Sequence, residues 1–211
     1  MNLFPRPLAF VDVETTGGSA DRHRVIEIGI VRIDPDGTAR RYSTLVNPGG
    51  SAPDFILELT GIDAGELAAA PSFEEVAWDA WDLMKGAVFV AHNARFDHAF
   101  LRREYERLDS ELRVQMLCSV RLSRALYPEF RRHDLSSVIA RMNLKMDRRH
   151  RALDDAEAVL EFFNRSANEK PDEFIKALNR LISPLPPRAT AWADLSPEPS
   201  PGPDLPTIQL G

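Results

Sequence analysis

Two carboxylates stand inside a stretch whose other residues predict a buried strand. The stretch is AFVDVETTGG, residues 9–18, and its acids are Asp12 and Glu14. Residues two apart in a strand point to the same face, so both carboxylates would lie on one side of the sheet. Burying such a pair requires compensation, because desolvation and mutual repulsion disfavour the charged forms. A basic side chain or a divalent cation could supply it, and this motif alone leaves both explanations open.

A third acid is predicted to face the same sheet from a helix. Residues 94–108, ARFDHAFLRREYERL, form an apolar stripe when they are placed about 100° apart around a helix axis. Asp97 lies at the edge of that stripe, away from the charged face. It is either a metal ligand or a partner for a core arginine or a nearby turn. Asn93, directly before the helix, is expected to cap it.

The stretch HRALDDAEAVLEFF, residues 150–163, contains two neighbouring acids that the helical period places on different faces. Asp155 lies on the margin of the buried face of this predicted helix, whereas Asp154 lies nearly opposite. His150 stands five positions before Asp155, which on a continuous helix would turn it about 140° away. It can approach Asp155 only from a loop before the helix, where it could act as a general base or simply be a surface residue.

These three segments suggest one shared site. Four carboxylates without cations would repel one another, whereas two Mg²⁺ or Mn²⁺ ions about 4 Å apart would neutralise them. We therefore expect Asp12, Glu14, Asp97 and Asp155 to surround a pair of divalent ions.

The elements that must hold these residues alternate along the chain. Strands are predicted at 8–15, 24–34, 40–48 and 87–93, and DPDGT marks a hairpin turn between the second and third. Helices are predicted from Ser72 to Met84, with Glu75 completing a capping box, and at 94–108, 119–126, 134–142 and 152–164. Trp78 and Trp81 are expected in the core. The pattern favours an α/β fold with a mixed sheet flanked by helices.

Composition predicts one domain and a tail. The chain has 211 residues, of which 44% are hydrophobic, so residues 1–182 suffice for one well-cored domain. Residues 183–211 hold eight of the sixteen prolines and read as an extended, disordered tail. The chain shows no apolar run long enough for a membrane helix and no secretion signal, so we expect a cytoplasmic protein. The single cysteine, Cys118, excludes an internal disulfide.

Basic residues are unevenly distributed. The net charge of −6 disfavours a protein that coats nucleic acid. Runs of arginine and lysine usually form a solvated face, but beside a site that binds phosphate they could steer a polyanion towards it. They are Arg95, Arg102, Arg103 and Arg107 in one helix, and Arg131, Arg132, Lys145, Arg148, Arg149 and Arg151 further along.

Read together, three segments resemble the exonuclease motifs of the DEDD superfamily. They are FVDVETTG, HNARFDHAFL and HRALDDAEAV, and the last has the histidine of the DEDDh branch. ELTGID (58–63), SVRLSRALYP (119–128) and HDLSSVIARMNL (133–144) also match the family. The resemblance covers Leu8 to Phe163 and is to proofreading-type 3′→5′ exonucleases, including the epsilon subunit of bacterial DNA polymerase III.

The resemblance implies an RNase H-like fold with a five-stranded mixed sheet whose first three strands are antiparallel. It implies that Asp12, Glu14, Asp97 and Asp155 hold two Mg²⁺ or Mn²⁺ ions and that His150 takes the proton from the attacking water. The product would be a nucleoside 5′-monophosphate. The implied contacts to the 3′-terminal nucleotide are Thr15, Thr16, Leu59, Thr60 and Phe96.

The resemblance leaves the substrate and partners open. Single-stranded or mispaired DNA competes with RNA trimming, and a non-catalytic scaffold on the same fold is a further alternative. Cys118 and Ser119 replace an Asp-Thr pair that many relatives carry, which we expect to affect packing or partner choice. The tail could bind a DNA polymerase, and TIQL (207–210) faintly resembles clamp-binding peptides.

Overall fold

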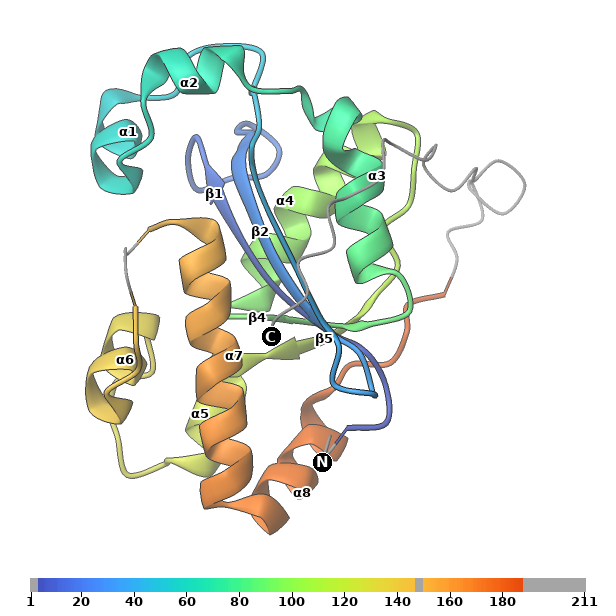
Figure 1. Ribbon diagram of the computed structural model, residues 1–211, viewed down its shortest axis with the longest axis vertical. Coiled ribbons are helices and arrows are strands. Elements are labelled where there is room, and N and C mark those ends of the chain that lie inside the picture. Colours follow the sequence, from blue (N-terminus) through green and yellow to red (C-terminus); the bar gives the residue numbers. More distant parts are fainter. Residues whose placement is uncertain (1–3, 147–149, 188–211) are drawn as a thin grey trace.

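A five-stranded mixed sheet forms the centre of the protein. The computed structural model describes residues 4–146 and 150–187. The strands follow the order β3-β2-β1-β4-β5, in which β1 to β3 are antiparallel and β4 and β5 run parallel to β1 (Figure 1). Their bounds are β1 Leu8–Thr15, β2 Val25–Ile33, β3 Ala39–Leu45, β4 Val88–Ala91 and β5 Gln115–Cys118. The expected fold class is confirmed.

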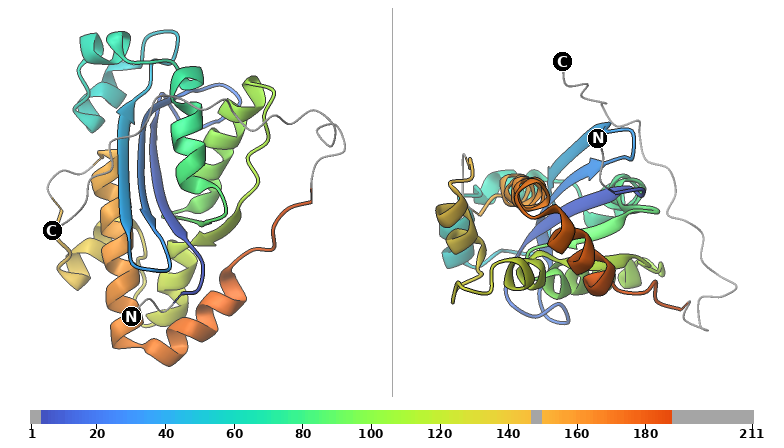
Figure 2. Two further views of the ribbon diagram at one scale, coloured as in Figure 1. Left: turned by 45° about the vertical axis from the view of Figure 1, so that its right-hand side comes forward. Right: turned by 90° about the horizontal axis from the view of Figure 1, so that it is seen from below.

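Helices cover both faces of the sheet. Helices α3 (Phe73–Met84) and α4 (Ala94–Arg107) pack on one face. Helices α5 (Ser119–Leu126), α7 (Ala152–Glu169) and α8 (Pro171–Leu181) pack on the other, and α6 (Leu135–Met142) packs against α7. Figure 2 shows α3 and α7 on opposite sides of the strands.

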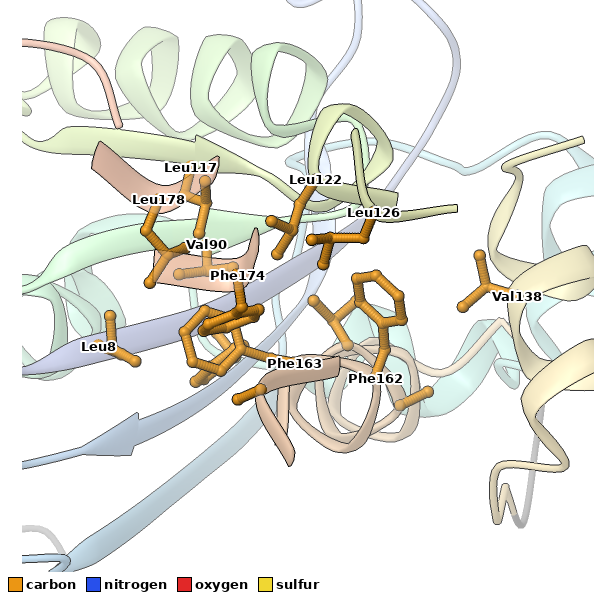
Figure 3. Close-up of a cluster of buried hydrophobic side chains, with 14 of the residues drawn as sticks. Leu8, Val90, Leu117, Leu122, Leu126, Val138, Phe162, Phe163, Phe174 and Leu178 are labelled. Carbon is orange, nitrogen blue, oxygen red and sulfur yellow. The ribbon is translucent and has the colours of Figure 1, made fainter. Parts of the chain in front are cut away.

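Strand β1 divides two hydrophobic cores. Phe10 joins the core beneath α7, where its ring meets Phe163 edge to face at 5.3 Å (Figure 3 shows part of this cluster). Ala9 and Val11 join the core beneath α3 and α4. Because side chains alternate along a strand, Asp12 and Glu14 leave β1 on the same face as Phe10, towards α7. The strand is apolar on both sides because helices cover both sides.

Two short helices lie above the N-terminal end of α7 in Figure 1. Helix α1 (Asp54–Thr60) ends at Gly61, which has the left-handed backbone conformation, and Asp63 caps α2 (Ala64–Ala69). Their apolar residues form a small core of their own with Ile26 of β2. Neither helix was predicted from the sequence, because each is too short to show a helical period.

Several local expectations were wrong. Trp78 and Trp81 are half-buried and stack on each other with ring centroids 5.1 Å apart, so they cover the core rather than fill it. The Asn93 side chain makes no capping hydrogen bond; its backbone is left-handed, with φ at 74°. Helix α7 continues to Glu169, beyond the predicted end at 164. Strand β5 and helix α8 were not predicted from their residues.

Within the described residues, none of the helices has the length and apolar character needed to cross a bilayer. Helix α8 ends at Leu181, close to the expected domain boundary at 182, which stays a prediction. Residues 188–211, including the TIQL segment, lie outside the described residues, as do Arg148 and Arg149.

Candidate active site

The two acids of β1 enter a cluster of like charges. Asp12 and Glu14 are both half-buried, and the strand pairing shifts register directly after Glu14. Burial raises the pKa of Asp12 well above its ordinary value, and the negative charges of Asp97, Asp155 and Glu14 raise it further. Three segments that are distant in the sequence therefore meet at Asp12.

Asp97 connects helix α4 to strand β1. It lies in the first turn of α4 and is 3% exposed. Its Oδ1 accepts a hydrogen bond from the backbone N–H of Val13 at 3.3 Å, between the two acids of β1. Its Oδ2 is buried and has no hydrogen-bond partner within the described part of the chain. Burial raises the pKa of Asp97 to about 8; Glu14 and Asp155 add to the rise, and backbone N–H groups oppose it.

Asp155 and His150 meet at the start of α7. Asp155 is 5% exposed, and its Oδ2 accepts a hydrogen bond from the backbone N–H of His150 at 3.2 Å. His150 lies in a turn before the helix, with φ at 60°, and is half-buried rather than exposed. Glu14, His150 and Asp155 each offer one ligand atom, and these three atoms lie within 4.8 Å of one another.

The clustered acids repel one another, and a bound cation would relieve this repulsion. Within residues 4–146 and 150–187, no arginine or lysine forms an ion pair with Asp12 or Asp97, so the alternative of a core arginine partner for Asp97 is not realised. A buried carboxylate oxygen without a donor, among other carboxylates, is an oxygen ligand suited to a hard divalent cation. The donor set can therefore hold divalent metal ions.

The residues expected to contact the terminal nucleotide lie in different environments. Thr15 and Thr16 are buried, and their hydroxyl groups shape the turn after β1: Thr15 Oγ1 donates to Gly17 O, and Thr16 Oγ1 accepts from Arg24 N. Thr60 is buried and donates to Ile56 O.

Two apolar side chains of this set are more accessible. Leu59 on α1 is 50% exposed, and Phe96 on α4 is half-buried against Phe100, with ring centroids 4.8 Å apart. Apolar surfaces of this kind suit contact with a base or sugar. The nucleotide-binding role of all five residues stays a prediction.

Strand β2 carries a buried acid, Glu27, that was not predicted from the sequence. Glu27 of β2 is 1% exposed and lies opposite Glu14. It forms an ion pair with Arg151 at 2.8 Å and accepts the backbone N–H of Ala152 at 3.1 Å. Glu27 thus anchors the beginning of α7, between His150 and Asp155. A lone carboxylate in the run VIEIGIVRI was the signal that could have revealed it.

Close approach of two backbones completes this anchor. A Cβ atom at Gly29 would lie 2.2 Å from the carbonyl carbon of Ala152, so only glycine lets the start of α7 approach β2 this closely. Glu27 and Gly29 therefore fix the position of Asp155 relative to the acids of β1.

Fold and acid cluster together define an exonuclease domain. The chain belongs to the exonuclease family: the RNase T model of that family, described as Exonuclease, matches residues 9–163. The resemblance to the DEDD superfamily is thereby confirmed.

Two curated proteins are similar to this chain over most of its length. A PolC-type DNA polymerase III of Caldanaerobacter subterraneus is 35% identical over 174 residues, which cover 82% of this chain and 12% of that protein. The 3′-5′ exonuclease DinG of Bacillus subtilis is 36% identical over 177 residues, covering 81% of this chain and 19% of that protein. The chain thus spans less than a fifth of either relative.

Solved structures share the fold at low sequence identity. Exonuclease I of E. coli in complex with a dT13 oligonucleotide has a TM-score of 0.68 and 17% identity, over 81% of this chain and 43% of that one. A 3′-exonuclease that recognises a histone mRNA stem-loop has a TM-score of 0.65 and 19% identity, over 78% and 82% of the two chains. Exonuclease I has also been solved with bound zinc, and the family depends on divalent metal ions.

Proposed function

We propose that this protein is a metal-dependent 3′→5′ exonuclease that hydrolyses the terminal phosphodiester of single-stranded or mispaired DNA and releases nucleoside 5′-monophosphates. The observation that carries the proposal is the convergence of acids from β1, α4 and α7 with Asp97 Oδ2 buried and without a donor in the described part of the chain. A scaffold on the same fold has no use for such a cluster, because it destabilises the protein.

Each site residue has a distinct part in the proposed reaction. Asp12, Glu14, Asp97 and Asp155 would hold two Mg²⁺ or Mn²⁺ ions. When bound, such ions neutralise charge on the phosphate under attack and on the leaving oxygen. His150, placed beside Glu14 and Asp155, takes the proton from the attacking water.

Phe96 and Leu59 would contact the terminal base and sugar, and Thr15, Thr16 and Thr60 would shape the pocket around them. Apolar contact with a base tolerates any sequence, which suits an enzyme that trims ends without sequence preference.

DNA is the proposed substrate because the curated relatives include PolC-type DNA polymerases and DinG, and a structural neighbour holds oligo-dT. A proofreading role with a DNA polymerase is supported by the PolC-type relatives. Binding of a polymerase or clamp through residues 183–211 is proposed from the proline-rich sequence and the TIQL segment alone. RNA trimming is the second candidate, favoured by the neighbour that recognises an mRNA stem-loop.

Matched oligonucleotides test the proposal. DNA and RNA of the same sequence, single-stranded or with a mispaired 3′ end, are labelled at the 5′ end and incubated with Mg²⁺, Mn²⁺ or EDTA. We expect a ladder of products shortened from the 3′ end of DNA, with metal only. Asp155→Asn should eliminate the ladder, and the neighbouring Asp154→Asn should retain it. Preferential cleavage of RNA would transfer the function to RNA trimming, and no cleavage of either nucleic acid would refute it.

A further inference from the structure

A cavity lies between the start of α4, strand β5 and helix α5. It has a volume of about 530 Å³ and opens at the ends of β4 and β5. Its lining includes Asn93 and Arg95 from the start of α4, Cys118 from the end of β5, Arg121 and Arg124 from the first and last turns of α5, and Leu181 from α8. We call it the arginine pocket. Arg95 stands two positions before Asp97, so one helical turn contributes to both sites.

The topology makes this position suitable for a ligand. Strands β4 and β5 are parallel neighbours, yet α4 leaves towards one face of the sheet and α5 towards the other. Crevices at the carboxyl ends of parallel strands, where successive helices diverge to opposite faces, are common binding sites in open α/β sheets. Strand β5, which lines the pocket, is two positions from β1 in the sheet, so it runs roughly 10 Å from the strand that carries Asp12 and Glu14.

The charges in this pocket are not compensated. Arg95, Arg121 and Arg124 are exposed, and none of them forms a hydrogen bond or ion pair with another part of the described chain. No aspartate or glutamate is among the described residues that line the pocket.

Other arginines of α4 are different. Arg102 and Arg103 pair with Glu106, and Arg107 pairs with Glu104. Within the described chain, Arg95 is therefore the arginine of α4 that presents a free positive charge, and it does so beside Arg121 and Arg124.

We propose that the arginine pocket binds backbone phosphates of the DNA strand on the 5′ side of the scissile bond. This inference rests on the proposed function and names where the rest of the strand lies. Three guanidinium groups on two helices suit several consecutive phosphates, because arginine donates paired hydrogen bonds to phosphate oxygens. A single terminal nucleotide, bound at the acids, would not reach them.

A charge reversal separates strand binding from chemistry. Arg121→Glu/Arg124→Glu is compared with Arg131→Glu/Arg132→Glu, which makes the same change in net charge at exposed residues outside the pocket. The substrates are dT10 and the p-nitrophenyl ester of thymidine 5′-monophosphate, which has no upstream phosphate.

We expect the pocket variant to raise KM for dT10 by about tenfold or more and to change kcat/KM for the ester by less than about twofold. The dependence of binding on salt should also become weaker, by about 0.7 in the log–log slope for each phosphate that the variant no longer neutralises. Equal losses on both substrates, no loss on either, or the same loss in the control variant would overturn the inference.

Cys118 provides a readout that needs no catalysis. It is the chain's single cysteine, is half-buried, and lines the pocket. In EDTA, dT10 should slow its alkylation by iodoacetamide, thymidine 5′-monophosphate should not, and the pocket variant should lose the protection. An unchanged alkylation rate with saturating dT10 would refute the inference. If the wild-type protein cleaves neither substrate, the proposed function fails, and alkylation alone then decides whether the pocket binds DNA.

Discussion

Two sets of buried acids lie in the central sheet or on helices packed against it, and they differ in what surrounds them. Glu27 and Glu104 are each 1% exposed, and each is bound by arginine: Arg151 for the first, Arg24 and Arg107 for the second. Each also accepts a backbone N–H. Asp97 is nearly as deeply buried, but within the described residues no arginine pairs with it, and it lies among other acids.

The difference separates architecture from chemistry. A carboxylate with its own arginine holds two elements together, as Glu27 holds α7 to β2. A carboxylate among other carboxylates raises their pKa values and weakens the fold, so its presence requires a cation to offset it. Burial of an acid is therefore not the sign of a reactive site; lack of compensation is.

The largest expected effect comes from removing an uncompensated acid. Asp97→Asn should lower DNA hydrolysis by at least about a thousandfold, because a proposed metal ligand is lost. The melting temperature in EDTA should stay unchanged or rise, because one member of a repelling cluster is removed. Scanning calorimetry of both proteins in EDTA checks this. A drop of several degrees would place Asp97 with the structural acids instead.

Removing a compensated acid should have the opposite signature. Glu27→Gln leaves Arg151 without its partner and weakens the anchor of α7, so the free energy of unfolding should fall by about 2–4 kcal/mol. The loss should appear with and without metal. Urea denaturation at pH 7 measures it, with Glu104→Gln as a second compensated acid. A loss below about 0.5 kcal/mol would end the distinction between the two sets.

The pH dependence of the metal-free protein sharpens the comparison further. Asp97 has its pKa raised to about 8, so between its unfolded pKa near 4 and about 8 the folded state binds more protons than the unfolded state. Stability in EDTA should therefore fall as pH rises through this window, by at most about 1.4 kcal/mol per pH unit from this group. Urea titrations at pH 5, 6, 7 and 8 measure the slope.

Two control measurements show whether Asp97 causes that slope. Asp97→Asn should flatten it, because the titrating group is gone, and saturating Mg²⁺ should flatten it in the wild-type protein. An equally steep slope in the variant would assign the effect to other groups.

The smallest effect should come from compensation at the surface. The Arg103 side chain is 44% exposed and pairs with Asp21 and Glu106. Arg103→Ala should change the free energy of unfolding by less than about 0.5 kcal/mol, because solvent screens exposed ion pairs. The same urea assay detects any larger change, which would mean that α4 depends on its surface charges.

The sequence predicted the acids of the site because their positions follow regular periods. Alternation along β1 placed Asp12 and Glu14 on one face, and the 3.6-residue period placed Asp97 and Asp155 on the inner margins of α4 and α7. The first three strands, the capping box of α3 and the bounds of α5 followed from equally local signals.

What failed depends on interactions between distant residues. Glu27 carries the same local signal as Asp12, and only the arrival of Arg151 shows that it is structural. Arg103 pairs with Glu106 three positions along its own helix, which the sequence could indicate, and with Asp21 from a distant loop, which it could not. Strand β5 has four residues, too few to show alternation, although Pro171 at the start of α8 was a usable signal.

Because residue 29 is a glycine, the main chain of α7 contacts the main chain of β2, and this contact sets the spacing of the acids. The first turn of α7 rests directly on β2, without a side chain between them that could adopt another rotamer. The contact between two peptide groups therefore sets the distance from Asp155 to Asp12 and Glu14. Peptide groups are more rigid than packed side chains. Neighbouring core residues can therefore vary in size without changing this distance.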